Sequence, residues 1–245
     1  MPPKKRLDLL LVEIGLADSR QHARSLIMAG NVLVDTLRVD KPGTQINTAS
    51  KVAIKGDLMP YVSRGGLKLE AALQETGLSV TNRICMDVGA STGGFTDCLL
   101  QHGAAKVYAV DVGYGQLAWK LRQDSRVVAI ERTNVRHMAH SDIPEPVDLV
   151  TIDTSFISLR IVVPAVLKFM KPNAEILALI KPQFEVGKGN VGKGGVVRDS
   201  KLRENIIVEL TQFFCEQKLE CGPTVPSPIL GPKGNQEYII LLSKP

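Results

Sequence analysis

A glycine-rich turn within residues 84–97, Ile-Cys-Met-Asp-Val-Gly-Ala-Ser-Thr-Gly-Gly-Phe-Thr-Asp, is the strongest chemical signal in the sequence. An apolar run that ends at Asp87 predicts a buried strand, and residues 95–101 have helical character until His102 and Gly103 end it. Such a turn lets a ligand approach bare main chain, while the free N–H groups of the helix N-terminus attract an anion. The turn therefore predicts a binding site for a ligand that carries an anionic group.

Three classes of ligand use this kind of turn, and the residues separate them. A dinucleotide site requires G-x-G-x-x-G, but Ala90 and Ser91 follow Gly89, so the glycine that admits a pyrophosphate is missing. A phosphate-binding P-loop requires a lysine where Phe95 stands. The remaining class is S-adenosylmethionine, whose methionine end offers one carboxylate to the amides of the turn and one ammonium group to Asp87. A turn with structural acids alone is the alternative.

A second predicted strand, residues 106–110, ends at Asp111, where a carboxylate can accept hydrogen bonds from both ribose hydroxyls of an adenosine. A third, residues 127–130, is followed by Thr133 and Asn134. We therefore expect S-adenosyl-L-methionine as the cofactor, bound by Asp87, Gly89, Ala90, Ser91, Gly93, Gly94, Phe95, Thr96, Asp111 and Asn134.

The elements that position these residues alternate between strand and helix. Further strands are predicted at residues 147–152, 175–180 and 238–242, and helices at residues 67–76, 117–123, 161–170 and 201–218. This alternation predicts an α/β fold with a Rossmann-like, mostly parallel sheet that binds ligands at the carboxyl ends of its strands. Asp153 and Lys181 also follow predicted strands. Glu237 precedes the last strand, so it would reach the same edge only if that strand ran antiparallel.

Residues 1–59 are predicted to form a separate, small α+β domain. Two helices, the second capped by Asp18 or Ser19, precede short strands at residues 31–35 and 51–55. Through Glu70 there are eleven Lys and Arg against seven Asp and Glu, whereas the remainder has nineteen against eighteen. This positive excess indicates either an RNA-binding surface or an ordinary solvated one. Residues 60–66 then read as an interdomain linker and residues 67–245 as the catalytic domain.

Composition excludes several classes of protein. The chain has 245 residues, of which 44% are hydrophobic and 22% charged, which is typical of a globular protein. Four cysteines without a C-x-x-C pair predict reduced, buried thiols in a cytoplasmic protein, and His137 and His140 lack neighbouring ligands for a metal. Asp8 and Glu13 interrupt the apolar N-terminal stretch, so neither a signal peptide nor a membrane span is expected.

The pattern Leu-Val-Glu-x-Gly-Leu-Ala-x-Ser-Arg, continued to residue 35, resembles the αL RNA-binding domain of ribosomal protein S-four, pseudouridine synthases and tyrosyl-tRNA synthetases. The resemblance covers residues 5–57. It implies that arginines of this domain and the linker contact RNA phosphates, which position an enzyme without specifying sequence. These are Arg6, Arg20, Arg24 and Arg64.

Lys68, Asp153, Lys181 and Glu237 match, in order and setting, the Lys-Asp-Lys-Glu tetrad of FtsJ-type RNA ribose 2′-O-methyltransferases. With the αL domain, the chain resembles the TlyA family, named as haemolysins and including rRNA 2′-O-methyltransferases that act on cytidines. The motifs are Ser-Arg-Gly-Gly-Leu-Lys-Leu at residues 63–69, the glycine-rich turn, and Ile-Lys-Pro-Gln-Phe-Glu at residues 180–185. The resemblance implies rRNA or ribosomal subunits as partners. We expect a monomer or a weak dimer.

The chemistry fits these residue types, because a ribose 2′-hydroxyl is a poor nucleophile that needs a base or an aligned acceptor. We assign Lys181 as base or orienter, Asp153 as its partner, and Lys68 and Glu237 as substrate-positioning groups. A chain end at Pro245 favours the shorter family type, directed to large-subunit rRNA. The alternatives are two chance salt bridges, a catalytically weak ribosome assembly factor, and a haemolysin-like membrane-lytic protein.

Overall fold

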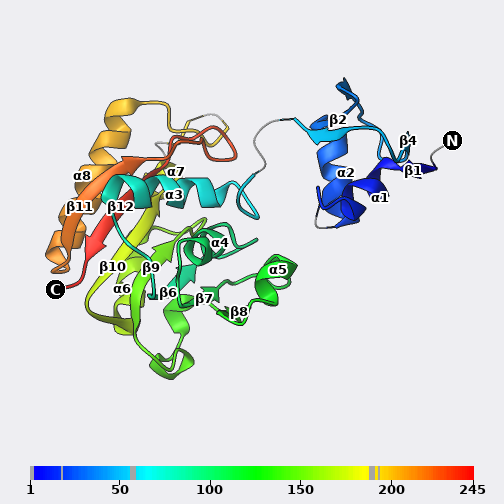
Figure 1. The fold of residues 1–245 in the computed structure, drawn as a ribbon. Coiled ribbons are helices and arrows are strands. Elements are labelled where there is room, and N and C mark those ends of the chain that lie inside the picture. Colours follow the sequence, from blue (N-terminus) through cyan, green and yellow to red (C-terminus); the bar gives the residue numbers. More distant parts are fainter. Residues whose placement is uncertain (1–2, 18, 56–58, 188–190, 193) are drawn as a thin grey trace. The chain divides into compact units, whose positions relative to one another are not determined.

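The structure is a computed structural model that describes residues 3–17, 19–55, 59–187, 191–192 and 194–245. Contacts divide the chain into two compact units, Met1–Pro60 and Tyr61–Pro245. In Figure 1 the first unit runs from blue to cyan and the second from cyan to red. Each unit is described by itself.

The first unit is a small α+β domain with its own apolar core. Its helices and strands are β1 (Lys4–Arg6), α1 (Leu7–Glu13), α2 (Arg20–Met28), β2 (Val32–Val34), β3 (Leu37–Arg38), β4 (Gln45–Asn47) and β5 (Val52–Ile54). β1 pairs with β4, and a three-stranded antiparallel sheet has the order β3-β2-β5. Ser19 caps α2 by accepting a hydrogen bond from the His22 amide, as one of the two predicted caps; Asp18 lies outside the described residues.

The second unit is built on a seven-stranded sheet. Its strands are β6 (Ile84–Val88), β7 (Lys106–Val110), β8 (Val127–Ile130), β9 (Val147–Ile152), β10 (Met170–Ile180), β11 (Glu220–Pro226) and β12 (Tyr238–Ser243). The order is β11-β12-β10-β9-β6-β7-β8, in which β8, β7, β6, β9 and β10 are parallel. β12 runs antiparallel to both of its neighbours. The predicted fold class, mostly parallel with an antiparallel last strand, is confirmed.

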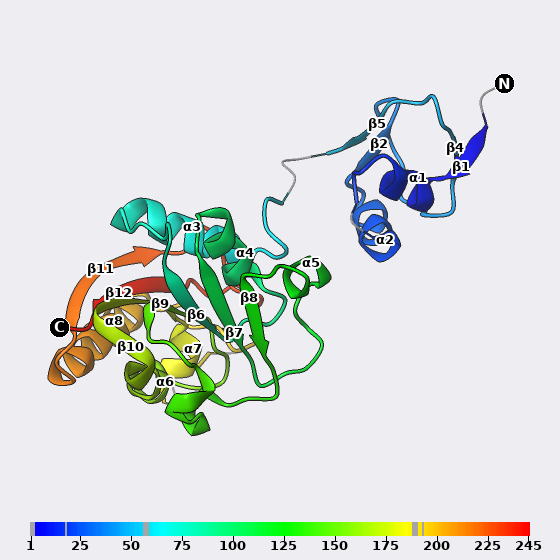
Figure 2. The same ribbon diagram turned by 60° about the horizontal axis from the view of Figure 1, so that its bottom comes forward.

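Helices cover both faces of this sheet, as Figure 2 shows. They are α3 (Gly65–Thr76), α4 (Gly94–Gln101) and α5 (Trp119–Arg122), then α6 (Leu159–Val166), α7 (Pro182–Glu185) and α8 (Ser200–Glu216). Successive strand residues enter different cores, because side chains alternate across a strand. Cys85 packs in the cluster that contains α3 and α4 residues, whereas its neighbour Met86 packs in the cluster that contains α6 and α8 residues.

Several features differ from the sequence predictions. The elements β1, β3, β4 and α7 were not predicted, and the helix predicted at residues 161–170 is Leu159–Val166, with β10 beginning at Met170. β11 was not predicted, and two prolines in its seven residues hide it because proline disrupts strand patterns except at sheet edges, where β11 lies. The predicted linker at residues 60–66 is different in structure, since Tyr61 is buried in the core of the second unit and α3 begins at Gly65. Cys85 and Cys98 are buried, but Cys215 is exposed and Cys221 is only partly buried, so the prediction of four buried thiols is wrong for the last two.

Within the described part of the chain, no helix is long and apolar enough to cross a membrane. The same residues contain no group of three or more His, Cys, Asp or Glu side chains placed to hold a metal ion.

Candidate active site

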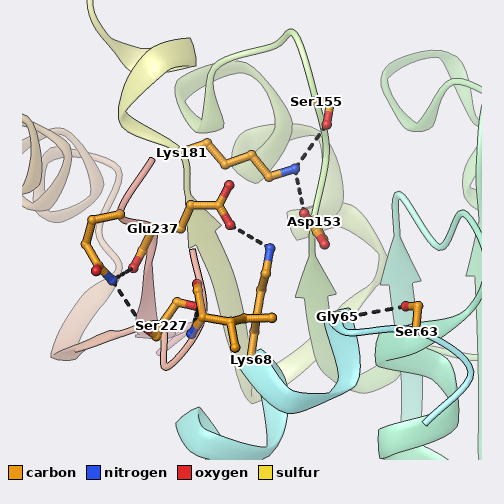
Figure 3. Close-up of polar contacts among 10 residues, drawn as sticks. Ser63, Gly65, Lys68, Asp153, Ser155, Lys181, Ser227 and Glu237 are labelled. Carbon is orange, nitrogen blue, oxygen red and sulfur yellow. Dashed lines mark hydrogen bonds and ion pairs between the residues drawn. The ribbon is translucent and has the colours of Figure 1, made fainter. Parts of the chain in front are cut away.

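The four tetrad residues come from four different parts of the chain and meet at the carboxyl ends of the parallel strands. Asp153 follows β9 and Lys181 follows β10, at the carboxyl ends of parallel strands. Glu237 precedes β12, and its antiparallel register pairs Ile180 with Tyr238, which brings Glu237 to the end of β10. Lys68 lies in the first turn of α3. Figure 3 shows the four side chains pointing toward one another, with ammonium and carboxylate groups in alternation.

Lys68 and Glu237 form a buried ion pair. Lys68 Nζ donates to Glu237 Oε2 at 2.5 Å, and the two side chains are 9% and 1% exposed. Glu237 Oε1 is also buried and has no hydrogen-bond partner among the described residues. This oxygen lies against Gly231, where an added Cβ would come within 2.3 Å of it.

Lys181 is held by two oxygen atoms that follow β9. Its Nζ lies 2.6 Å from Asp153 Oδ1 and donates to Ser155 Oγ at 3.0 Å. The Lys181 side chain is 9% exposed, whereas that of Asp153 is 22% exposed. This arrangement fixes the end of a long, flexible side chain at a partly open position, which an orienting or proton-accepting group requires.

The segment after Lys181 is anchored to the start of α6. Glu185, at the end of α7, accepts hydrogen bonds from Ser158 Oγ at 2.6 Å and from the Leu159 amide at 2.8 Å. Burial raises the pKa of the Glu185 carboxyl, and these two donors partly offset that effect. The anchor ties the end of β10 to the loop after β9, and so it positions Lys181 relative to Asp153.

The tetrad faces a cavity of about 740 Å³, a size within the usual range of ligand pockets. All four tetrad residues contribute to it, together with part of the glycine-rich turn and two later loops. Of the predicted cofactor residues, the cavity is lined by Gly89, Ala90, Ser91, Gly94 and Phe95. The lining does not include Asp87, Gly93, Thr96, Asp111 or Asn134.

Neighbouring protein atoms leave no room for a side chain at two glycines of the turn. A side chain on Gly89 would approach the Asp153 carbonyl oxygen to 2.7 Å, and one on Gly93 would collide with Leu121. Gly89 and Gly93 also have positive φ values of 86° and 95°, which glycine adopts without strain. The turn is thus pressed closely between the end of β9 and α5.

Asp87 is not on the cavity surface. Its carboxylate is fully buried and accepts hydrogen bonds from Thr96 Oγ1 at 2.7 Å and Thr151 Oγ1 at 3.1 Å. Burial raises the pKa of Asp87 to about 7, although the two threonine donors favour the charged form. The expected direct contact between Asp87 and the cofactor ammonium group is therefore not supported, because the carboxylate lies behind the turn and braces it.

Asp111 contacts the turn directly, whereas Asn134 does not. Asp111 Oδ2 accepts from the Ser91 amide at 2.8 Å and Oδ1 accepts from the Gly113 amide at 2.7 Å. Each oxygen retains a second lone pair and the residue is only half-buried, so ribose hydroxyls can still reach it. The Asn134 side chain instead accepts from the Arg136 amide at 3.1 Å and caps a short 3₁₀ helix, Val135–His137.

The predicted RNA-binding arginines differ in their surroundings. Arg64 is exposed and lines the cavity. In the first unit, Arg6 forms two hydrogen bonds of 3.0 Å with the buried Asp8 carboxylate, to which Arg20 Nε also donates at 2.9 Å. The Arg6 and Arg20 side chains remain 41% and 53% exposed, so each keeps N–H groups for a phosphate. Arg24 is exposed on α2.

Among the cavity residues that were not predicted from the sequence, Ser155 and Phe156 lie in the loop that follows β9. Ser155 holds Lys181, but a serine in a loop gives no periodic signal. Phe156 is 89% exposed and adopts a φ of 65°, a conformation that is strained for an aromatic residue. Its ring centroid lies 5.0 Å from that of Phe184, so the cavity entrance carries an aromatic pair.

Comparison with known proteins agrees with this architecture. The family described as FtsJ-like methyltransferase matches residues 61–244, and the S4 domain family matches residues 5–52. A Mycobacterium tuberculosis protein named 16S/23S rRNA (cytidine-2'-O)-methyltransferase TlyA is 47% identical over 243 residues, 99% of this chain and 91% of that protein. A Campylobacter jejuni protein named 23S rRNA (cytidine-2'-O)-methyltransferase TlyA is 37% identical over 190 residues, 76% of this chain and 72% of that protein.

Solved structures give the same result. A Streptococcus thermophilus protein, named only provisionally as a hemolysin, aligns with a TM-score of 0.77 and 43% identity. The alignment covers 100% of this chain and 90% of that one. With a methyltransferase domain that fills the second unit, an S4 domain in the first and full-length relatives, the chain belongs to the TlyA family of FtsJ-like methyltransferases.

Proposed function

We propose that this protein transfers a methyl group from S-adenosylmethionine to the ribose 2′-hydroxyl of a cytidine in large-subunit rRNA. The proposal rests on one observation. Two lysines and two carboxylates form ion pairs at the carboxyl ends of the parallel strands, and all four line one cavity. The substrate is proposed from the names of the two relatives, both of which include cytidine of 23S rRNA. We place the enzyme in the cytoplasm, where ribosomal subunits are found.

The proposed cofactor site combines Asp111 with the main chain of the turn at residues 89–95. Asp111 would accept the ribose hydroxyls of the cofactor, and the amides near the start of α4 would hold its carboxylate. When bound there, S-adenosylmethionine supplies an electrophilic methyl group. Asp87 acts indirectly, by fixing the turn through Thr96.

The proposed task of Lys181 is to hold the 2′-oxygen in line with the methyl group, and to accept its proton if the amine is neutral. Asp153 and Ser155 fix the position of the Lys181 nitrogen. Lys68 and Glu237 position the ribose, as a buried ion pair that forms part of the cavity lining. Phe156 offers a ring on which the target base can stack.

RNA affinity is proposed to come mainly from cations outside the tetrad. Arg64 at the cavity and Arg6, Arg20 and Arg24 on the S4 domain would contact phosphates. Asp8 would orient Arg6 and Arg20 for this purpose, because both guanidinium groups are fixed by its buried carboxylate.

The test is single-turnover transfer of a labelled methyl group to unmodified ribosomal large subunits. Alkaline hydrolysis of the product RNA then reports the site of methylation, because a methylated 2′-oxygen protects the adjacent phosphodiester bond. Lys181→Ala should lower the rate by about 10²–10⁴ with cofactor affinity unchanged. Lys181→Arg separates the two roles, since arginine can orient the oxygen but cannot act as a base.

Transfer without protection from alkali would show methylation of a base and contradict the proposal. A wild-type protein that binds large subunits but transfers no methyl group would instead support the role of an assembly factor.

A further inference from the structure

One wall of the cavity is made by two loops that are far apart in the sequence. Gly195 lies in the loop that precedes α8, and Lys233 lies in the connection between β11 and β12, residues 227–237. The second loop contributes Ile229, Leu230, Pro232 and Lys233 to the cavity, and it ends at Glu237. Apart from Glu237, the residues of these two loops have no part in the tetrad or in the proposed cofactor site.

Asn235 joins the two loops. The residue is 1% exposed, its Oδ1 accepts from the Val197 amide at 2.9 Å, and its Nδ2 donates to the Gly195 carbonyl at 2.9 Å. Its own carbonyl accepts from the Gly231 amide at 2.9 Å. A buried amide whose donor and acceptor atoms are both used in this way fixes the loop, since breaking either bond would leave a buried polar group unpaired.

The same loop is packed tightly against the tetrad. The Ser227 amide donates to the Glu237 carbonyl at 2.8 Å, and a side chain on Gly231 would collide with the Glu237 carboxylate. The position of the loop is therefore set relative to Glu237 at one end and to residues 194–197 at its side.

Lys233 is the cation that this loop presents to the cavity. Its side chain passes close to Gly195, where a Cβ atom would lie 3.4 Å from both Lys233 Cδ and Nζ. Across the described part of the chain, no carboxylate forms an ion pair with Lys233, in contrast to Lys68 and Lys181. Lys233 thus carries a charge that is not neutralised within these residues.

We propose that residues 227–237 form a phosphate-binding loop for the RNA strand, in which Lys233 contacts a backbone phosphate and Asn235 positions it. This inference rests on the proposed function. A ribose that presents its 2′-hydroxyl to the tetrad carries a phosphate on the adjacent 3′-oxygen, so an anion always accompanies the reacting group into the cavity. Because the tetrad cations are already paired, that phosphate requires another cation of the cavity lining, and Lys233 is the one on the loop that ends at Glu237.

The experiment uses the full-length protein with Lys233→Gln, Lys233→Arg and the control Lys201→Gln, which removes an exposed lysine of α8 outside the cavity lining. Single-turnover methyl transfer is measured against the concentration of unmodified large subunits, between about 50 and 200 mM KCl at fixed Mg²⁺. Lys233→Gln should raise the half-saturating concentration about fivefold to tenfold and lower the log–log salt slope by about 0.7–0.9. The maximal rate should change much less, and Lys233→Arg should restore binding.

Asn235→Ala tests the positioning role. Asparagine has no charge, so a lower salt slope in this variant would show that it acts through Lys233, and a merely structural role would leave the slope unchanged. The double variant with Lys233→Gln should show no further loss of slope, as coupled residues are not additive.

Equal binding and equal salt slopes for Lys233→Gln and Lys201→Gln, with an active wild type, would overturn this inference and leave the proposed function intact. Weaker binding of S-adenosylmethionine by Lys233→Gln, measured by calorimetry without RNA, would also overturn it, because Lys233 would then serve the cofactor. A wild type without transfer would refute the proposed function itself.

Discussion

The buried pair of Lys68 and Glu237 allows stability and catalysis to be separated by mutation. Glu237→Ala would leave the Lys68 ammonium group without its carboxylate at a site where the lysine side chain is 9% exposed. Breaking a buried pair on one side costs about 3–5 kcal/mol, which is a large part of the about 5–15 kcal/mol by which domains are stable. Glu237→Ala should therefore lower the free energy of unfolding of the catalytic unit by about 3–5 kcal/mol.

Replacing both partners should have a different effect. In Lys68→Met with Glu237→Leu, two apolar side chains of similar volume fill the space, and such replacements of buried pairs are often neutral or stabilising. We expect the double variant to regain most of the stability lost in Glu237→Ala and to remain inactive, since neither proposed ribose-positioning group is present.

Urea unfolding followed by far-ultraviolet circular dichroism measures these changes, because most helical residues lie in the catalytic unit. The matched control is Glu209→Ala, which removes the 67% exposed partner of Arg160 and should cost less than about 1 kcal/mol. Equal losses for Glu237→Ala and Glu209→Ala would refute the reasoning on burial. Methyl transfer by the double variant at the wild-type rate would refute the functional role of the pair.

Three further predictions concern single residues. Asp111→Asn should weaken S-adenosylmethionine binding by about 1–3 kcal/mol in calorimetric titration, because it removes charge from the acceptor of the ribose hydroxyls; an unchanged affinity would remove Asp111 from the site. Burial raises the pKa of Asp87 from 3.8 to about 7 in the folded protein. Between pH 3.8 and about 7 the folded state therefore keeps this proton while the unfolded state loses it, so stability should fall as pH rises through this range. Relative to Asp87→Asn, the wild type should lose roughly 4 kcal/mol between those two pH values in urea unfolding, and parallel pH profiles would contradict this. Arg24→Ala should lower the salt slope of RNA binding by about 0.7–0.9 without affecting protein stability, whereas Arg20→Ala should also destabilise the S4 domain, because it leaves Asp8 with one fewer donor; equal melting temperatures for the two variants would contradict the second part.

The sequence predicted the strands of the catalytic unit well, because apolar runs that end in an acid or lysine are characteristic of buried parallel strands. The predicted strands at residues 106–110, 127–130 and 147–152 have the bounds of β7, β8 and β9. Glu237 could reach the carboxyl ends of the parallel strands only if the last strand ran antiparallel to them. The structure confirms that β12 is antiparallel to β10.

What the sequence could not provide is the direction in which a polar side chain points. In the sequence, Asp87 and Asp111 each close an apolar run, yet Asp87 lies within β6 and is fully buried, whereas Asp111 follows β7 and is half-buried. The difference depends on Thr96 and Thr151, which come from separate elements. Asn235 and Ser155 were missed for a related reason, as their partners are brought close only by tertiary folding.

The alternation of two ammonium and two carboxylate groups in the tetrad makes the reaction centre close to electroneutral before any substrate arrives. A centre without net charge exerts little long-range force on RNA, so cations elsewhere on the protein must provide the electrostatic attraction. Encounter with RNA and the chemical step then respond to different conditions. Added salt should slow association in proportion to the phosphates contacted, while the rate of methyl transfer at saturating RNA should remain almost constant, since the charges that perform it neutralise one another at contact distance.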